Sequence, residues 1–237
     1  MYMMSMKVPF SQVDQEGNMT MDAIVDALQD CTMFHCDSVG RSVVDLTGEK
    51  GYWYIASWQI QIIRAPKAFE IITVTTNPYS FKGFFGNRCY EIRSAHGEQL
   101  VKADSTWVYL DSATHSPARI PEEEGKRYGE PAAPVEMERA PRKIKLPPED
   151  QMTKAEPVPV RYCQLDTNRH VNNCEYIRTF MDVTGLYGLP KQLRAEYRLA
   201  AKESDVFYPY VYRDDTRCVV DLRGEEKSDY AVIEAIF

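Results

Sequence analysis

Residues 166–177 read Asp-Thr-Asn-Arg-His-Val-Asn-Asn-Cys-Glu-Tyr-Ile, and here a polar turn runs straight into a helical pattern. Apolar residues recur beyond it at spacings of three and four, which predicts a helix over residues 173–184. Asn173 is the expected N-terminal cap and Gly185 the expected stop, because these residue types suit the two ends of a helix. The stretch therefore marks the start of a helical element in the second half of the chain.

The first half of the chain contains the same order of elements in a longer form. Apolar residues on one face predict a helix over residues 20–39. Val8-Pro9 precedes Asp14 ahead of this helix, just as Val158-Pro159 precedes Asp166. Period-two patterns bounded by turn residues predict the strands. These cover residues 52–62, 71–76, 88–94 and 101–110 in the first half, and 160–165, 193–200, 206–212, 217–222 and 230–237 in the second.

This repeated order predicts an α+β protein built from two copies of one fold with antiparallel sheets. Between the copies, Pro, Glu, Lys and Arg replace most apolar residues, which predicts an extended linker. The expected division is an N-terminal domain over residues 1–120, a linker over residues 121–158 and a C-terminal domain over residues 159–237.

The composition restricts the class of protein. The 237 residues are 44% hydrophobic and 27% charged, which predicts a globular protein with a sizeable core. A net charge of -7 argues against nucleic-acid binding, because that binding needs an excess of clustered Lys and Arg. The six cysteines form no CxxC pair, and no apolar run reaches membrane-spanning length. We therefore expect reduced thiols, no structural zinc, a cytoplasmic location and no membrane insertion.

Asp166, Asn168 and His170 alternate along the turn, so their side chains can project to one side before the helix begins. The helix N-terminus near Asn172 and Asn173 offers unpaired N–H groups and a positive dipole end, which suit the oxyanion of acyl transfer. A histidine moves protons near neutral pH, a carboxylate acts as base or nucleophile, and an amide orients a water molecule. The turn therefore predicts hydrolysis of an activated acyl group.

A plainer interpretation of the same turn stays open. Asp166 and Asn168 can serve only as turn and capping residues, with His170 as a polar neighbour outside any chemistry. The first half offers a comparison, because Asp14-x-Glu-x-Asn18 occupies the matching places without a histidine. One site, in the second half, is therefore expected.

Other reactive side chains are weaker candidates. Cys174 follows His170 by four residues, but free cysteines are usually small buried hydrophobes. A zinc site made of Cys163, His170 and Cys174 matches no standard ligand spacing. The remaining histidines, His35 on a helix, His96 in a turn and His115 in a loop, are expected to be structural or solvated.

Five stretches along the chain are similar, in the same order, to one protein family. They are Asp26-Ala-Leu-Gln-Asp30, Trp58-Gln-Ile-Gln-Ile62, Ser80-Phe-Lys-Gly-Phe-Phe-Gly-Asn-Arg88, Asp166–Ile177 and Glu196-Tyr-Arg198. The chain thereby resembles the acyl-[acyl carrier protein] thioesterases, including the plant-type enzymes that end fatty-acid synthesis.

The resemblance spans nearly the whole chain, and it implies a fold and an activity. It implies two tandem hot-dog domains, each a long helix wrapped by an antiparallel sheet, with the acyl pocket in the first and catalysis in the second. It also implies that Asp166, Asn168 and His170 are the catalytic residues. The implied partner is an acyl carrier protein that bears a fatty acyl chain, and no cofactor is implied.

One position departs from the family pattern. The plant-type enzymes place a carboxylate two residues beyond the landmark Arg198, where this chain has Ala200. Glu196 is an imperfect replacement, because four residues along a strand separate the two positions by roughly 13 Å. Three accounts stay open: the other polar residues act with an ordered water molecule, Glu203 reaches in from a loop, or turnover is slow.

Three rival functions also stay open: an acyl-CoA thioesterase of the same fold, a non-hydrolysing acyl-thioester-binding protein, and a hot-dog dehydratase that only the fold supports. Because acyl carrier protein is acidic, a local basic face is expected on the enzyme. Its candidate residues are Arg139, Arg142, Lys143 and Lys145 in the linker, and Arg161, Arg169, Arg178, Lys191, Arg194 and Arg198 near the site. The sequence leaves the acyl chain length and the oligomeric state open, a homodimer included.

Overall fold

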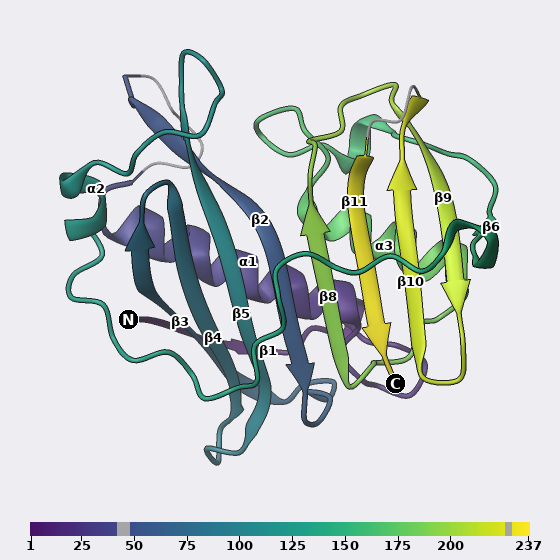
Figure 1. Cartoon of the computed structure of the whole chain (residues 1–237). Helices are drawn as coiled ribbons and strands as arrows, with labels where there is room; N and C mark the ends of the chain where they lie inside the picture. Colours follow the sequence, from purple (N-terminus) through teal and green to yellow (C-terminus); the bar gives the residue numbers. More distant parts are fainter. Residues whose placement is uncertain (42–47, 226–228) are drawn as a thin grey trace.

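Two long helices lie on one face of a single antiparallel sheet in the computed structural model (Figure 1). The structure describes residues 1–41, 48–225 and 229–237. The long helices are α1 (Met21–Ser38) and α3 (Asn173–Thr184), and α2 (Glu122–Lys126) is short. Within the described ranges the strands are β1 (Tyr2–Lys7), β2 (Gly51–Ile62), β3 (Ile71–Lys82), β4 (Phe85–Ser94), β5 (Gln99–Asp111), β6 (Thr153–Lys154), β7 (Val158–Pro159), β8 (Gln192–Tyr197), β9 (Val206–Arg213), β10 (Arg217–Arg223) and β11 (Asp229–Ile236). No helix among these residues is long and apolar enough to span a bilayer.

Two copies of one topology meet at β2 and β8, near the centre of the sheet. The strand order is β1-β3-β4-β5-β2-β8-β11-β10-β9-β6. In each copy, the first strand after the long helix lies innermost, so β3-β4-β5-β2 corresponds to β9-β10-β11-β8. The inner strands pair antiparallel from Ser57↔Glu196 to Gln61↔Gln192. This arrangement confirms the predicted α+β fold of two tandem hot-dog units.

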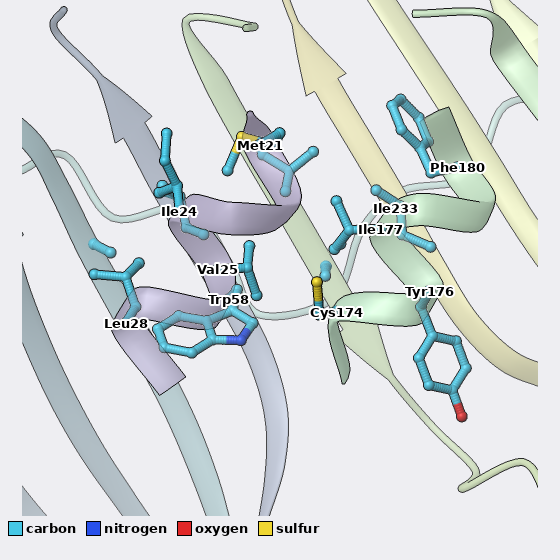
Figure 2. Close-up of a cluster of buried hydrophobic side chains, with 14 of the residues drawn as sticks. Met21, Ile24, Val25, Leu28, Trp58, Cys174, Tyr176, Ile177, Phe180 and Ile233 are labelled. Atoms are coloured by element: carbon cyan, nitrogen blue, oxygen red, sulfur yellow. The ribbon is translucent and has the colours of Figure 1, made fainter. Parts of the chain in front are cut away.

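The apolar faces of the two helices pack against the inner face of the sheet. Figure 2 shows this layer, in which labelled side chains of both helices form one buried cluster with Trp58 of β2 and Ile233 of β11. The helix residues of the layer are Met21, Ile24, Val25, Leu28, Cys174, Tyr176, Ile177 and Phe180, and each is at most 2% exposed. Complete burial of one such large apolar side chain contributes about 1.5–3 kcal/mol. The apolar residues whose periodicity predicts the two helices are therefore the residues that contact the sheet.

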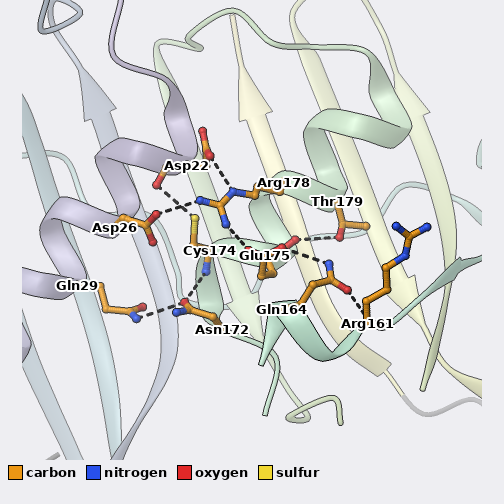
Figure 3. Close-up of polar contacts among 10 residues, drawn as sticks. All are labelled: Asp22, Asp26, Gln29, Arg161, Gln164, Asn172, Cys174, Glu175, Arg178 and Thr179. Carbon is orange, nitrogen blue, oxygen red and sulfur yellow. Dashed lines mark hydrogen bonds and ion pairs between the residues drawn. The ribbon is translucent and has the colours of Figure 1, made fainter. Parts of the chain in front are cut away.

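Polar contacts fix α3 against α1 (Figure 3). Arg178 of α3 forms ion pairs with Asp22 and Asp26 of α1 at 2.8 and 3.1 Å. Gln29 of α1 donates to the Oδ1 atom of Asn172 at 3.3 Å, just ahead of α3. The loop that leads into α3 is therefore held from both sides, by its own helix and by the helix of the other copy.

The two ends of α3 test the predicted cap and stop. Gly185 adopts the left-handed conformation at the C-cap, with φ of 66°, which confirms the predicted stop. The predicted cap is wrong by one residue, because the side chain of Asn172, not Asn173, accepts the N–H of Cys174 at 3.2 Å. Asn173 instead donates its side-chain amide to Gln29 at 3.0 Å.

In the first half, the strand predictions fail at two places. The strand predicted over residues 71–76 is too short, because Asn77 and Pro78 lie inside β3. The register shifts between Pro78 and Ser80, and such a bulge tolerates a proline that cannot donate a hydrogen bond. The pattern also misses β1, which pairs with β3 from Tyr2↔Thr76 to Lys7↔Ile71. Its methionines and serine lack the β-branched signal that marks most strands.

In the second half, residues 160–165 do not form the predicted strand. β7 ends before this stretch, residues 162–164 form a 3-10 turn, and Leu165 makes a single antiparallel bridge to Val171. The Gln164 side chain accepts the backbone N–H of Arg161 at 2.8 Å, which favours the turn over an extended strand. The predicted strand at residues 193–200 also ends early, because β8 stops at Tyr197.

The segment that follows α2 crosses the outer face of the sheet, opposite the helices (Figure 1). Gln59 of β2 donates to the Glu138 carbonyl at 2.9 Å, and the Ile144 N–H donates to Glu196 of β8 at 2.9 Å. Residues 55–60 of β2 are therefore all buried, where the alternating pattern predicts a half-buried strand.

Candidate active site

A cavity of about 1440 Å³ lies where β2 and β8 stop pairing. The part of β2 that precedes Ser57 has no partner in β8, and both this part and the loop before α3 line the cavity. Asp166, Asn168 and His170 all belong to the lining. The structure thus brings the three predicted site residues together on one wall.

The loop that contains these residues is a closed turn held by one carboxylate. Asp166 Oδ1 accepts the backbone N–H groups of Asn168 and His170 at 2.8 and 3.1 Å. The Asp166 N–H donates to the His170 carbonyl at 2.7 Å, and Arg169 takes the left-handed conformation with φ of 60°. One oxygen of the Asp166 carboxylate, Oδ1, therefore orders the backbone of the turn. The other oxygen, Oδ2, takes part in neither of these two hydrogen bonds.

The first copy contains the same turn without the histidine. Asp14 Oδ1 accepts the N–H groups of Glu16 and Asn18, both at 2.9 Å, and the Asp14 N–H donates to the Asn18 carbonyl at 2.8 Å. Gly17 supplies the left-handed residue, with φ of 74°. Asn18 thus occupies the place of His170. Both copies thus use an aspartate to hydrogen-bond the backbone of the turn. Only the turn of the second copy contains an imidazole.

The environment of His170 favours the neutral imidazole. Burial lowers the pKa of His170, the negative charge of Asp166 acts in the opposite direction, and the charges of Lys202 and His115 lower it further. No described residue donates to or accepts from its ring, which lines the cavity. A neutral imidazole that faces a cavity can accept a proton from a water molecule.

The amide groups at the start of α3 differ from the prediction. The Asn172 N–H donates to the Gln164 carbonyl at 2.9 Å, so this amide is engaged and the expectation that it binds an oxyanion is wrong. Asn173 is the first residue of α3, and it lines the cavity. Its N–H has no described acceptor, and it lies at the positive end of the helix dipole, where negative charge is favoured.

Residues of the first copy line the same cavity. Tyr52 and Tyr54 of β2 line the cavity, and Tyr52 Oη lies 3.0 Å from Nδ1 of His115. Burial raises the pKa of Tyr54, with smaller contributions from Tyr52 and Asp166. Tyrosines on a strand and a loop histidine become site residues only through the pairing of β2 with β8, which no local pattern encodes.

The structure also places the candidates for the missing carboxylate. Ala200 lines the cavity, as its place in the family pattern implies. Glu196 is 2% exposed. Its carboxylate accepts the Ile144 N–H and forms an ion pair with Arg198 at 3.3 Å, so both of its oxygens are already engaged. Glu203 is exposed and is not among the described lining residues.

Cysteine and metal chemistry find little support here. Cys174 is 1% exposed, and burial raises its pKa, which disfavours the reactive thiolate. Its Sγ atom donates to the Asp22 carbonyl at 3.3 Å. Cys163 is exposed, and no group of three or more His, Cys, Asp and Glu side chains in the described ranges is placed to hold a metal ion.

Four of the ten predicted basic residues are neutralised by neighbouring carboxylates. Arg139, Arg178, Arg194 and Arg198 form ion pairs with described carboxylates. Arg142 and Lys143 line the cavity from the segment on the outer face of the sheet. These two are the basic residues of the predicted set that lie at the cavity without a described ion pair.

Comparisons with known proteins match most of the chain to one family. The family model for the acyl-ACP thioesterase N-terminal domain matches residues 1–128, and that for the C-terminal domain matches residues 148–200. A chloroplastic acyl-[acyl-carrier-protein] hydrolase of Cuphea viscosissima is 26% identical over 207 residues, which are 79% of this chain and 50% of that protein. A chloroplastic oleoyl-acyl carrier protein thioesterase of Arabidopsis thaliana is 29% identical over 210 residues, 79% of this chain and 56% of that protein. The chain spans about half the length of the curated relatives it matches.

Solved structures share the fold over nearly the full chain. An acyl-ACP thioesterase from Bacteroides thetaiotaomicron has a TM-score of 0.86 at 18% identity, with 99% of this chain and 96% of that chain covered. The 12:0-ACP thioesterase from Umbellularia californica has a TM-score of 0.81 at 16% identity, with the same coverage of 99% and 96%. At sequence identities of 18% and 16%, these comparisons show a shared fold and do not by themselves show a shared activity.

Proposed function

Because the chain belongs to the acyl-ACP thioesterase family, we propose that it hydrolyses fatty acyl-[acyl carrier protein] to a free fatty acid and the carrier protein, a step that ends fatty-acid synthesis. One observation carries the proposal. The second copy presents His170 to a large cavity from a turn that, in the first copy, holds Asn18 in its place. The histidine is therefore not needed to build the turn, and its chemistry is free for another use.

In the proposed reaction, the neutral imidazole of His170 takes a proton from a water molecule as that water attacks the thioester carbonyl. The oxyanion that forms is stabilised by the Asn173 N–H and the N-terminal end of α3. As the carbon–sulfur bond breaks, His170 returns the proton to the departing thiolate, so the products are a carboxylic acid and a thiol. Asn168 positions the water molecule, and the charge of Asp166 stabilises the transient imidazolium.

We assign the parts of the chain to separate tasks. The domain over residues 1–120 supplies most of the apolar cavity wall for the acyl chain, and the domain over residues 159–237 supplies the hydrolytic turn. The linker over residues 121–158 supplies Arg142 and Lys143, which offer a basic contact for an acidic carrier protein.

The six cysteines are all unpaired, which supports a reducing compartment such as the cytoplasm. Sedimentation of the purified chain distinguishes a monomer from a homodimer, which the sequence leaves open.

The test compares acyl carrier protein and coenzyme A that bear the same fatty acyl chain, with the release of free thiol as the measurement. We expect the carrier-protein substrate to be hydrolysed faster, with KM rising as salt screens the docking charges. The His170→Ala variant should lose most turnover, and the matched Asn18→Ala variant should keep it. Equal rates on both thioesters would favour an acyl-CoA hydrolase, and tight binding without thiol release would favour a non-hydrolysing binding protein.

A further inference from the structure

Arg88 of β4 is a buried cation on the cavity wall, away from the hydrolytic turn. It is 5% exposed and lines the cavity. Its Nη1 atom contacts His35 Nδ1 at 2.8 Å and donates to Thr76 Oγ1 at 3.2 Å, and its guanidinium lies 5.3 Å from the centre of the Tyr128 ring. Both hydrogen bonds come from Nη1, so Nε and Nη2 have no described acceptor.

No described carboxylate neutralises Arg88. His35 does not supply a compensating charge, because burial and the charge of Arg88 lower the pKa of this histidine to about 4, and it is neutral at pH 7. Thr76 and the ring of Tyr128 are neutral as well. An ionised group in a protein interior is normally paired, since desolvation of a lone charge is costly.

Arg41 on the same cavity wall shows the usual arrangement. It is 2% exposed, forms ion pairs with Glu49 and Glu124, and donates to the Gly51 carbonyl. Its charge is therefore compensated within the protein. Of these two buried arginines, Arg88 alone has no carboxylate partner and two nitrogen atoms without an acceptor among the residues that the structure describes.

The place of Arg88 in the sheet separates it from the reacting end of the substrate. Arg88 pairs with Ser105 of β5, which pairs with Trp58 of β2, which pairs with Ala195 of β8. Three steps between strands amount to about 14 Å. The hydrolytic turn lies beyond the end of β8, where the Val171 N–H donates to the Ala201 carbonyl. A ligand that reaches Arg88 from the turn must therefore extend across the first copy.

The cavity between these two points suits a chain that is apolar in the middle and polar at its end. Trp53, Phe81 and Trp107 line it with aromatic residues, and the polar residues Thr32 and Tyr128 also belong to the lining. Resting on the thioester hydrolysis proposed above, we propose that the enzyme prefers acyl chains that carry an oxygen function at the end distant from the thioester. The guanidinium of Arg88 binds this function, and a carboxylate, which also neutralises the charge, binds best.

The first test measures binding and does not depend on turnover. Calorimetry compares a dicarboxylic acid with a monocarboxylic acid of the same chain length, so that the two ligands differ only at the far end. The wild-type protein should bind the dicarboxylic acid at least about tenfold more tightly, and Arg88→Met should abolish the difference. Arg88→Lys, which keeps the charge but lacks the planar fork, should retain part of it. Equal binding of the two acids by the wild-type protein overturns the proposal, whether or not any variant folds.

The second test uses acyl carrier protein loaded with an unsubstituted, an ω-hydroxy or an ω-carboxy chain of equal length. The ratio of kcat/KM for the ω-carboxy chain to that for the unsubstituted chain should fall at least about tenfold in Arg88→Met. The ω-hydroxy chain should give an intermediate ratio, because it supplies an acceptor without a charge. An unchanged ratio in a folded Arg88→Met variant contradicts the role of Arg88, whereas hydrolysis of none of the three substrates contradicts the proposed function and leaves the calorimetric result to decide on Arg88.

Discussion

The duplicated turn allows the structural and catalytic roles of one residue to be separated by a pair of substitutions, Asp14→Ala and Asp166→Ala. Each removes a carboxylate oxygen that accepts two backbone N–H groups, at 2.9 and 2.9 Å in the first copy and at 2.8 and 3.1 Å in the second. A hydrogen bond of this kind contributes about 0.5–1.5 kcal/mol net, so each variant should lose about 1–3 kcal/mol of unfolding free energy. Asp14 also accepts from the side chain of Asn18 at 3.2 Å, and its variant should therefore lose at least as much.

Thermal unfolding followed by circular dichroism measures this loss. For a chain of this size, a loss of 2 kcal/mol lowers Tm by about 4–8 °C. Release of thiol from acyl carrier protein, assayed well below both transitions, should then distinguish the two variants. Asp14→Ala should keep wild-type turnover, and Asp166→Ala should fall at least about tenfold, because its charge no longer stabilises the imidazolium of His170. Equal turnover in the two variants would refute the assignment of chemistry to the second copy.

Three further predictions follow from single positions. Burial, the charge of Arg88 and the N-terminal charge lower the pKa of His35 to about 4, below the roughly 6.5 of an unfolded chain, so its contribution to stability is present above pH 6.5 and is lost as pH falls toward 4. This contribution is at most about 3.5 kcal/mol. Urea unfolding of His35→Gln at pH 7 and pH 4.5 should show a weaker pH dependence than the wild type; an identical dependence would exclude His35 as its source. Gly185→Ala forces alanine into φ of 66° and should cost about 1–2 kcal/mol, whereas the control Gly188→Ala, with no positive φ and open space around its Cβ, should not destabilise. Ala200→Glu adds a carboxylate to the cavity wall and should raise the pKa of His170, so the acid limb of the kcat/KM profile should move to higher pH; an unmoved limb would place Ala200 outside the electrostatic reach of the histidine.

The elements that the sequence predicts well are those governed by local rules. Both long helices follow from apolar spacing, because the residues at that spacing are the ones that contact the sheet. The end of α3 at Gly185 is also predicted locally, because glycine adopts the left-handed conformation of a helix C-cap without steric cost. The errors occur where a distant segment decides the outcome. The bulge at Pro78 is acceptable only in a strand that is paired elsewhere, and the burial of β2 on both faces depends on the segment that crosses the sheet some 80 positions later.

The candidate site divides in the same way. Asp166, Asn168 and His170 lie within five consecutive positions, so their proximity is a local property that the sequence reveals. Tyr52 and His115 reach the same cavity from the other copy, and their place depends on the register between β2 and β8. The environment of Arg88 is harder still to predict, because the lack of a carboxylate partner among the described residues depends on the position of every strand and helix around it.

The most direct test of the central claim is the variant His170→Asn, which gives the second turn the residue that the first turn already holds. Because Asn18 shows that asparagine fits this turn, the variant should fold with a Tm close to that of the wild type. Release of free fatty acid from acyl carrier protein should fall about 10²–10⁴-fold, the usual contribution of a general base. A folded His170→Asn protein that turns over at the wild-type rate would contradict the claim that this histidine performs the hydrolysis.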